Sequence, residues 1–166
     1  MIEYPIGSSG QVIVLADAVL HCFARSRQLR RSQTEAGGQL FARFDASRII
    51  VEEATGPRPS DRRTRTSFVP DRTAEQQEIL DRHVKGLHYV GDWHTHPDSC
   101  PIPSSVDLSS IAECVLKSEH TLNGFVLIIV GQNEPPDGLH VSIHDGSAFH
   151  RLMPGQEMGR AVWSQK

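Results

Sequence analysis

Two histidines, a serine and an aspartate lie close together in the sequence, at His94, His96, Ser104 and Asp107. Residues two apart in a strand point to one face about 7 Å apart, so the two imidazoles could bind a single ion. Pro97 then ends the strand, and Ser104 with Asp107 has the S-x-x-D spacing of a capping box at a helix start. A strand end followed by a capped helix therefore predicts a cluster of two imidazoles and one carboxylate.

Such a donor set suits a hydrolytic metal site. Two imidazoles and a carboxylate leave a tetrahedral zinc with one open position, where a water molecule has a pKa of about 7. Amide hydrolysis also needs a carboxylate that takes a proton from water and passes it to the leaving amine. Glu35 is the best candidate, because Gly37 and Gly38 allow close backbone approach just before an apolar strand. Glu52 and Glu53 also lie upstream and remain alternatives.

These residues resemble a known family. Glu35, the His94–Pro97 segment, Ser104 and Asp107 match the JAMM (JAB1/MPN+) metallopeptidase motif, E…H-x-H-x7-S-x2-D. The resemblance implies an α/β fold, a cytidine-deaminase-like MPN/JAMM domain in which helices flank a central mixed β-sheet. It implies that the two histidines and Asp107 hold Zn²⁺. It further implies that Glu35 is the acid/base and that Ser104 hydrogen-bonds the oxyanion.

The resemblance also implies a substrate class. The family cleaves isopeptide or peptide bonds after ubiquitin or ubiquitin-like proteins, and residues 91–108 look most like compact bacterial members. Some of those are encoded beside ubiquitin-like E1 and E2 enzymes in antiphage, CBASS-like systems. The implied partners are a ubiquitin-like protein or its conjugates, with an E1/E2-like enzyme, its conjugated target and a second copy of the chain as further candidates. Deconjugation and precursor processing both stay open.

Other functions fit the same residues less well. MPN domains without activity serve as scaffolds and binders, but they characteristically lose ligand residues that this chain keeps. A metallo-β-lactamase motif, H-x-H-x-D-H, would need histidine where Ser99 stands. The H-x-D…H order of non-haem iron oxygenases does not match a strand followed by a capped helix. Cys100 could be a fourth, inhibitory ligand, a redox group or a protease nucleophile, but a plain loop thiol is the preferred interpretation.

Length and composition indicate one ordinary globular domain. The chain has 166 residues, a formal net charge of −3 and three cysteines without a CxxC pair. This composition predicts reduced thiols, a cytoplasmic location, and neither a nucleic-acid nor a membrane partner. The expected organisation is a loose N-terminal arm (1–10), the catalytic domain (11–153) and a C-terminal tail (154–166).

Hydrophobic periodicity predicts alternating strands and helices. Strands are expected at residues 11–15, 38–43, 48–54, 67–69, 87–93, 125–130, 139–144 and 148–153. Helices are expected at 17–32, at 71–85 and from Ser104 onward, the last burying a face that contains Leu108, Ile111 and Val115. The second helix is expected to bury Ile79, Leu80, His83 and Val84.

Two groups of arginines stand out. Arg25, Arg27, Arg30 and Arg31 crowd the end of the first helix, either as a solvated terminus that complements the helix dipole or as a docking patch for an acidic partner. Residues 56–65 carry four more arginines in a predicted loop near the site. That loop is expected either to contact substrate or to be solvated.

Overall fold

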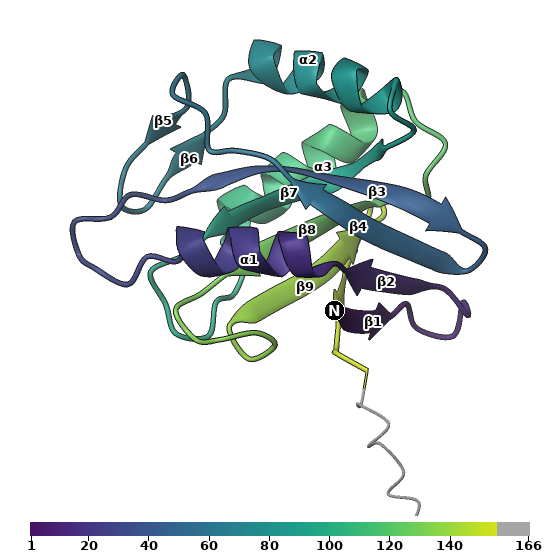
Figure 1. Ribbon diagram of the computed structural model, residues 1–166, viewed down its shortest axis with the longest axis horizontal. Helices are drawn as coiled ribbons and strands as arrows, with labels where there is room; N and C mark the ends of the chain where they lie inside the picture. Colours follow the sequence, from purple (N-terminus) through teal and green to yellow (C-terminus); the bar gives the residue numbers. More distant parts are fainter. Residues whose placement is uncertain (156–166) are drawn as a thin grey trace, which may run out of the picture.

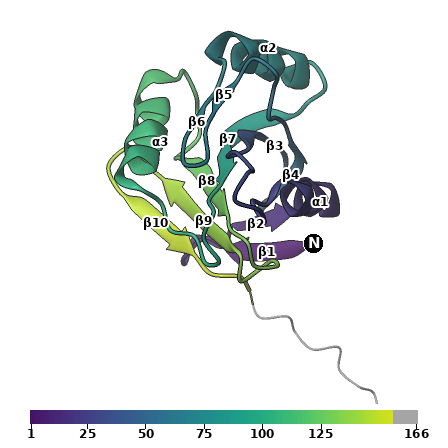
Figure 2. The same cartoon turned by 90° about the vertical axis from the view of Figure 1, so that its left-hand side faces the viewer.

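The protein is built around a curved, mixed β-sheet with helices on both faces, as the motif predicted (Figures 1 and 2). The computed structural model describes residues 1–155. The sheet has the order β1-β2-β4-β3-β7-β8-β9-β10. Its strands are β1 (Ile2–Pro5), β2 (Val12–Leu15), β3 (Gly37–Asp45), β4 (Arg48–Ala54), β7 (His88–Thr95), β8 (Phe125–Val130), β9 (Leu139–His144) and β10 (Phe149–Leu152).

Three helices and a small hairpin complete the fold. The helices are α1 (Asp17–Ser26), α2 (Arg72–His83) and α3 (Ser105–Lys117), and the hairpin pairs β5 (Arg62–Arg63) with β6 (Phe68–Val69). Phe23 of α1 packs in the larger apolar core on one face, and Ile111 of α3 packs in a smaller core on the other. Within residues 1–155 none of these helices has the length and apolar character needed to cross a lipid bilayer.

Strand β7 occupies the centre of the sheet and supplies the site. It runs antiparallel to β3 and parallel to β8, and α3 makes the crossover between β7 and β8. Alternation along β7 sends Trp93 into the α1 core, where it lies 5.1 Å from the Phe23 ring, and sends His94 to the face that α3 covers. The carboxyl end of β7 and the start of α3 therefore meet, which is where crossover folds place their ligand sites.

The chain ends differ from the prediction of a loose arm. Residues Ile2–Pro5 pair with β2 as an antiparallel edge strand, and the buried ring of Tyr4 joins the core. The backbone N–H of Gly155 donates to the carbonyl of Glu3. The arm was missed because four residues with one buried side chain carry little periodic signal. From residue 156 the predicted tail lies outside the described residues.

Two helices also depart from their predicted form. Helix α1 ends at Ser26, not at residue 32, because Arg27 turns to extended backbone and Gln28 is fully buried beneath the sheet edge. Helix α2 exposes Leu80 and His83 and buries Glu75, and Val84, just past its end, is exposed as well. Its inner side is polar because Arg58 Nε donates to Glu78 Oε1 over 2.9 Å. An ion-pair layer thus replaces the apolar face that periodicity predicted.

Candidate active site

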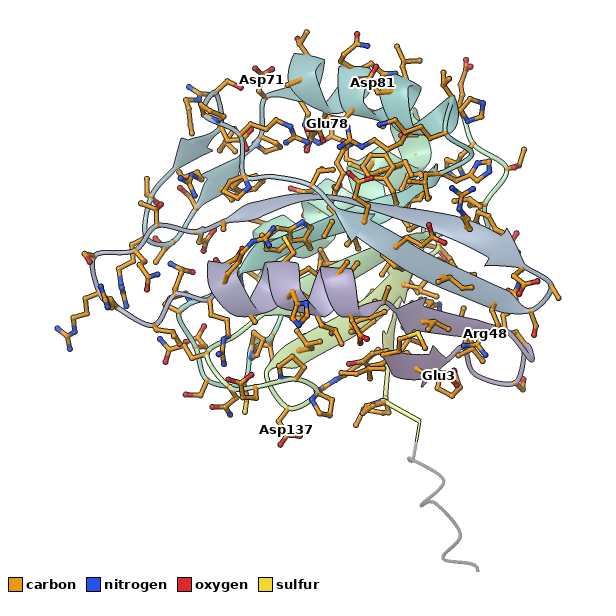
Figure 3. The ribbon with its side chains drawn as sticks, in the orientation of Figure 1. Glu3, Arg48, Asp71, Glu78, Asp81 and Asp137 are labelled. Atoms are coloured by element: carbon orange, nitrogen blue, oxygen red, sulfur yellow. The ribbon has the colours of Figure 1, made fainter. Side chains whose placement is uncertain are left out.

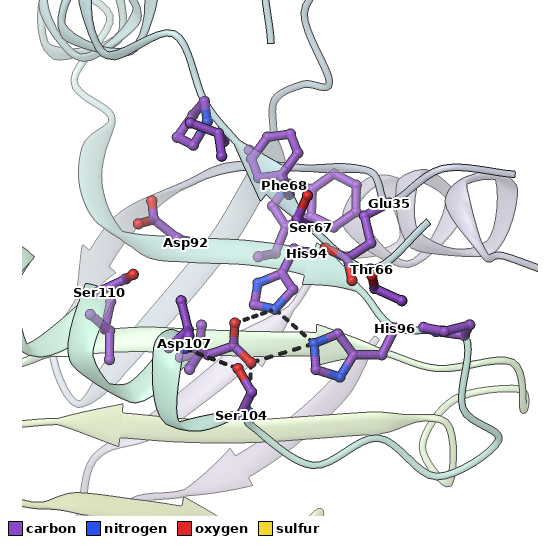
Figure 4. Close-up of a pocket in the computed structure, with 18 of the residues that line it drawn as sticks. Glu35, Thr66, Ser67, Phe68, Asp92, His94, His96, Ser104, Asp107 and Ser110 are labelled. Atoms are coloured by element: carbon purple, nitrogen blue, oxygen red, sulfur yellow. Dashed lines mark hydrogen bonds and ion pairs between the residues drawn. The ribbon is translucent and has the colours of Figure 1, made fainter. Parts of the chain in front are cut away.

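The structure brings His94, His96 and Asp107 to one point (Figure 4). His94 Nε2 lies 3.1 Å from Asp107 Oδ1, and His96 Nε2 lies 3.4 Å from Asp107 Oδ2. The two Nε2 atoms are 3.2 Å apart. All three donor atoms lie within 4.8 Å of one another, so the group can hold a metal ion with each residue giving one atom.

The capping box of α3 orients the aspartate. The backbone N–H of Ser104 donates to Asp107 Oδ2 over 2.6 Å, and the backbone N–H of Asp107 donates to Ser104 Oγ over 3.2 Å. Burial alone would raise the pKa of Asp107, but hydrogen bonds from the two histidines hold that pKa well below its ordinary value. The carboxylate is therefore ionised and directed at the imidazoles before any ion binds.

Ser104 lies in the same cleft as the three candidate ligands. Its Oγ accepts the capping bond from Asp107, which leaves the hydroxyl proton free to donate to another group. The predicted double role, as a helix cap and as a hydrogen-bond donor to substrate, is therefore geometrically available.

Glu35 comes from the opposite wall of the cleft. Gly37 pairs with His94 across β3 and β7, and the N–H of Glu35 donates to the carbonyl of Thr64 over 2.8 Å. Figure 4 shows its carboxyl beside the two imidazoles, on the other side from Asp107. Burial raises the pKa of Glu35 above its ordinary value. A buried carboxyl facing a possible ion position has the placement of a proton shuttle.

The glycines next to Glu35 permit this close approach. A Cβ at Gly37 would lie 2.8 Å from the Phe68 ring and from the carbonyl oxygen of Trp93. A Cβ at Gly38 would lie 1.9 Å from the carbonyl oxygen of Thr55. Side chains at either position would push β3 away from its neighbours and displace Glu35.

Two buried polar residues that were not predicted, Thr95 and Gln28, hold the backbone around the site. Thr95 Oγ1 donates to Gln28 Oε1 over 2.9 Å and accepts from the N–H of Ala36 over 3.0 Å. Both Thr95 and Gln28 are fully buried. Thr95 lies between the two histidines in the sequence, and Ala36 follows Glu35. These hydrogen bonds therefore hold the backbone that carries Glu35 against the strand that carries the histidines. The only sequence signal was a polar residue inside a central strand.

Thr95→Val should destabilise the protein and slow hydrolysis together. The variant leaves the Gln28 oxygen and the Ala36 N–H buried without partners, which costs about 2–4 kcal/mol in the free energy of unfolding. Urea unfolding and turnover would be measured beside Thr95→Ser, which keeps the hydroxyl. A valine variant as stable as the serine variant would contradict this role.

The cleft extends from the histidines to a second acidic region. Its cavity of about 650 Å³ also contacts Phe68 of the β5–β6 hairpin, Glu75 of α2, Asp92 of β7 and Ser110 of α3. Tyr89 donates to Asp92 over 2.9 Å, and Glu75 lies 2.8 Å from Arg72. Burial, with Asp92 nearby, raises the pKa of Glu75 to about 7. The burial of Glu75 was not predicted, because α2 was expected to present an apolar face.

Glu75→Gln should change the pH dependence of stability. Since folding raises the pKa of Glu75 from 4.5 to about 7, its ionisation costs stability as the pH rises between those values. The stability of the variant relative to wild type, measured as the difference in the free energy of unfolding, should therefore be about 1–3 kcal/mol higher at pH 8 than at pH 5. Urea titrations at both pH values measure it, with the exposed Glu119→Gln as control. An equal difference at both pH values would refute the assignment.

The alternative candidates lie elsewhere. Glu52 pairs with Arg43 over 3.2 Å and Glu53 with Arg82 over 2.7 Å, and neither lines the cavity. Cys100 is exposed, accepts a hydrogen bond from Asn133 and does not line the cavity either. Of these candidates, only Glu35 lines the cleft.

The four arginines of residues 56–65 separate into two kinds. Arg58 is nearly buried and ion-pairs with Glu78, so it belongs to the fold and not to a solvated loop. Arg62, Arg63 and Arg65 are exposed around the β5–β6 hairpin. Only these three can contact a partner.

Known proteins share the fold and much of the sequence. A solved protein of Desulfitobacterium hafniense superposes with a TM-score of 0.60 at 20% identity, over 84% of this chain and 88% of its own. A CD-NTase/cGAS isopeptidase of Escherichia coli is 26% identical over 126 residues, 74% of this chain and 78% of that protein. A CD-NTase/cGAS isopeptidase of Enterobacter hormaechei is 34% identical over 109 residues, which are 64% of this chain and 60% of that protein.

A fourth relative points to the same chemistry. A probable metalloprotease of Sinorhizobium fredii is 43% identical over 70 residues, 39% of this chain and 42% of that protein. Relatives that are isopeptidases and metalloproteases, together with a His-His-Asp group in a cleft, support a hydrolase. The family model described as prokaryotic homologs of the JAB domain matches residues 19–143, from α1 through nearly all of β9, and the chain belongs to that family.

Proposed function

We propose that this protein is a zinc-dependent isopeptidase that cleaves the bond joining the C-terminus of a ubiquitin-like or similarly conjugated protein to an amine. The observation that carries the proposal is the meeting of His94, His96 and Asp107 in one cleft with the buried Glu35. The names of the relatives make a CD-NTase the first conjugated protein to test. An antiphage conjugation system with E1- and E2-like enzymes is the proposed setting.

The donor set fits zinc. Two imidazole nitrogens and one carboxylate oxygen are common ligands of Zn²⁺, and three protein ligands leave a fourth position open. No thiol joins the group, and Cys100 does not line the cleft. Bound zinc would act as a Lewis acid on the carbonyl and lower the pKa of a water molecule.

The surrounding residues can complete the hydrolysis. Glu35 would take one proton from the attacking water as the water oxygen adds to the scissile carbonyl carbon. It would then give that proton to the amide nitrogen as the C–N bond breaks. The free hydroxyl proton of Ser104 would donate to the oxyanion that forms in between. The products are a carboxylate on the released protein and a free amine on its former target.

The test uses the purified protein and a CD-NTase joined through its C-terminus to a lysine. Hydrolysis is followed after metal removal by a chelator and after addition of Zn²⁺, Mg²⁺ or buffer alone. We expect activity to be lost with the metal and restored by Zn²⁺. Stoichiometric zinc without cleavage of this conjugate or of a ubiquitin-like precursor would overturn the proposal in favour of a binding role.

A further inference from the structure

Four exposed arginines lie beside the Glu35 wall of the cleft. Arg30 and Arg31 belong to the loop after α1, and Arg63 and Arg65 belong to the β5–β6 hairpin, two segments that lie on the same side of the molecule (Figure 1). Arg65 Nη1 donates to the carbonyl of Arg31 over 2.8 Å. Arg63 Nη1 donates to the carbonyl of Glu35 over 3.3 Å. We call these four residues the arginine patch.

The arginine patch forms no ion pair with the described part of the chain. Within residues 1–155, none of its guanidinium groups is within ion-pair distance of a carboxylate. Several arginines elsewhere are paired, as with Arg43, Arg48 and Arg82, each of which has a carboxylate within 3.2 Å. Outside the arginine patch, the described arginines without such a partner are Arg25, Arg62 and Arg151. Figure 3 shows the Arg48 and Glu3 side chains together. Most of the described arginines without a carboxylate partner therefore lie in the two segments beside the candidate base.

The backbone segments that carry the arginine patch are also held together. Gln28 is fully buried, and its Nε2 donates to the carbonyls of Gln33 and Arg65, which joins the loop to the hairpin. The carbonyl of Gln28 accepts from Gln132 Nε2 over 2.7 Å, so the β8–β9 turn supports the same loop. A surface that is already ordered pays little conformational entropy when a partner binds.

We propose that the arginine patch docks an acidic stretch of polypeptide carried by the conjugate. This inference rests on the proposed function, since it takes the partner to be a part of the substrate. Guanidinium groups bind carboxylates through paired hydrogen bonds, and clustered unpaired ones speed the encounter with an oppositely charged surface. The exposed Leu29 in the same loop adds an apolar contact for a peptide.

A polypeptide fits this surface better than a nucleic acid. The chain as a whole has a formal net charge of −3, which repels a phosphodiester backbone beyond the arginine patch. Residues 27–34 and 62–67 contain no aromatic side chain on which bases could stack. Binding of an oligonucleotide is therefore an outcome that would contradict the proposal.

The test measures binding to the full zinc-loaded protein by fluorescence anisotropy. The probe is a short labelled peptide of alternating glutamate and glycine, compared with the same peptide carrying glutamine and with a poly-dT oligonucleotide. We expect the glutamate peptide to bind best and to weaken as salt is added. Arg30→Glu with Arg31→Glu should weaken its binding by about tenfold.

A matched variant separates the arginine patch from net charge. Lys85→Glu with Arg151→Glu makes the same change in charge at exposed positions after α2 and on β10, and should change binding by less than about twofold. Equal losses in both double variants, or tighter binding of poly-dT than of the peptide, would overturn the proposal. With an acidic conjugate as substrate, the Arg30/Arg31 variant should raise KM and leave kcat unchanged.

The two proposals fail in different ways. If the wild type holds zinc and cleaves conjugates but does not prefer the glutamate peptide over the glutamine peptide, the docking role is wrong and the proposed function stands. If the peptide is bound through Arg30 and Arg31 but no conjugate is cleaved, the proposed isopeptidase function is wrong. The proposed role of the arginine patch in substrate binding is then wrong too.

Discussion

Glu35→Gln should retain its metal and lose hydrolysis by a factor on the order of 10²–10⁴. Glutamine keeps the size of the side chain but cannot take a proton from water, and none of the three candidate ligands is changed. Metal content by elemental analysis and single-turnover cleavage of a conjugate would be measured on the same preparation. Since Glu35 is buried, a normal urea unfolding curve is needed to show that the β3 wall is intact.

The matched controls for this variant are Glu52→Gln and Glu53→Gln. Both carboxylates lie outside the cleft in ion pairs with Arg43 and Arg82, so their loss should leave turnover within about twofold, as for other exposed pairs. Wild-type turnover in Glu35→Gln would exclude Glu35 as the base. Large losses in either control would move the base to β4.

His94→Ala and Asp107→Ala should each lose metal and activity together. Either change removes one of three protein donors, and a two-donor site holds zinc far more weakly. The expected result is less than a tenth of the wild-type zinc content after dialysis, with turnover reduced on the order of 10³-fold or more. His83→Ala, an exposed histidine of α2, is the control.

Asp107 needs a second variant because its carboxylate also caps α3. Asp107→Ala should lose about 1 kcal/mol of stability in addition to the metal. Asp107→Asn can still accept from the Ser104 N–H, so it should keep the helix and yet bind metal poorly. Stoichiometric zinc in both His94→Ala and Asp107→Ala would refute the site.

The local geometry of the site could be predicted from the sequence because it depends on short spacings. The alternation of His94 and His96 and the S-x-x-D pattern at Ser104 fix their own backbones, and the capping box is present in the structure. The place of Glu35 opposite them depends on strand pairing. The glycines after Glu35 and the resemblance to the JAMM motif pointed to this residue, but no local spacing fixes its position.

What could not be predicted depends on polar contacts between distant segments. Glu75 is buried beside Arg58, which reaches it from the loop that precedes the β5–β6 hairpin. The bond between Gln28 and Thr95 joins two residues that no local rule connects. Hydrophobic periodicity assumes that buried faces are apolar, so it assigned α2 the wrong orientation and extended α1 past its end.

The shared bonds of Ser104 and Asp107 have an evolutionary consequence. A mutation of Asp107 that removes its side-chain oxygens is selected against twice, once through the metal and once through the start of α3, whereas the His94 side chain does not cap a helix. We therefore expect descendants of this protein that abandon catalysis to lose Glu35 or a histidine first. Ser104 and Asp107 should persist in such descendants because they still cap α3 after the metal site is lost.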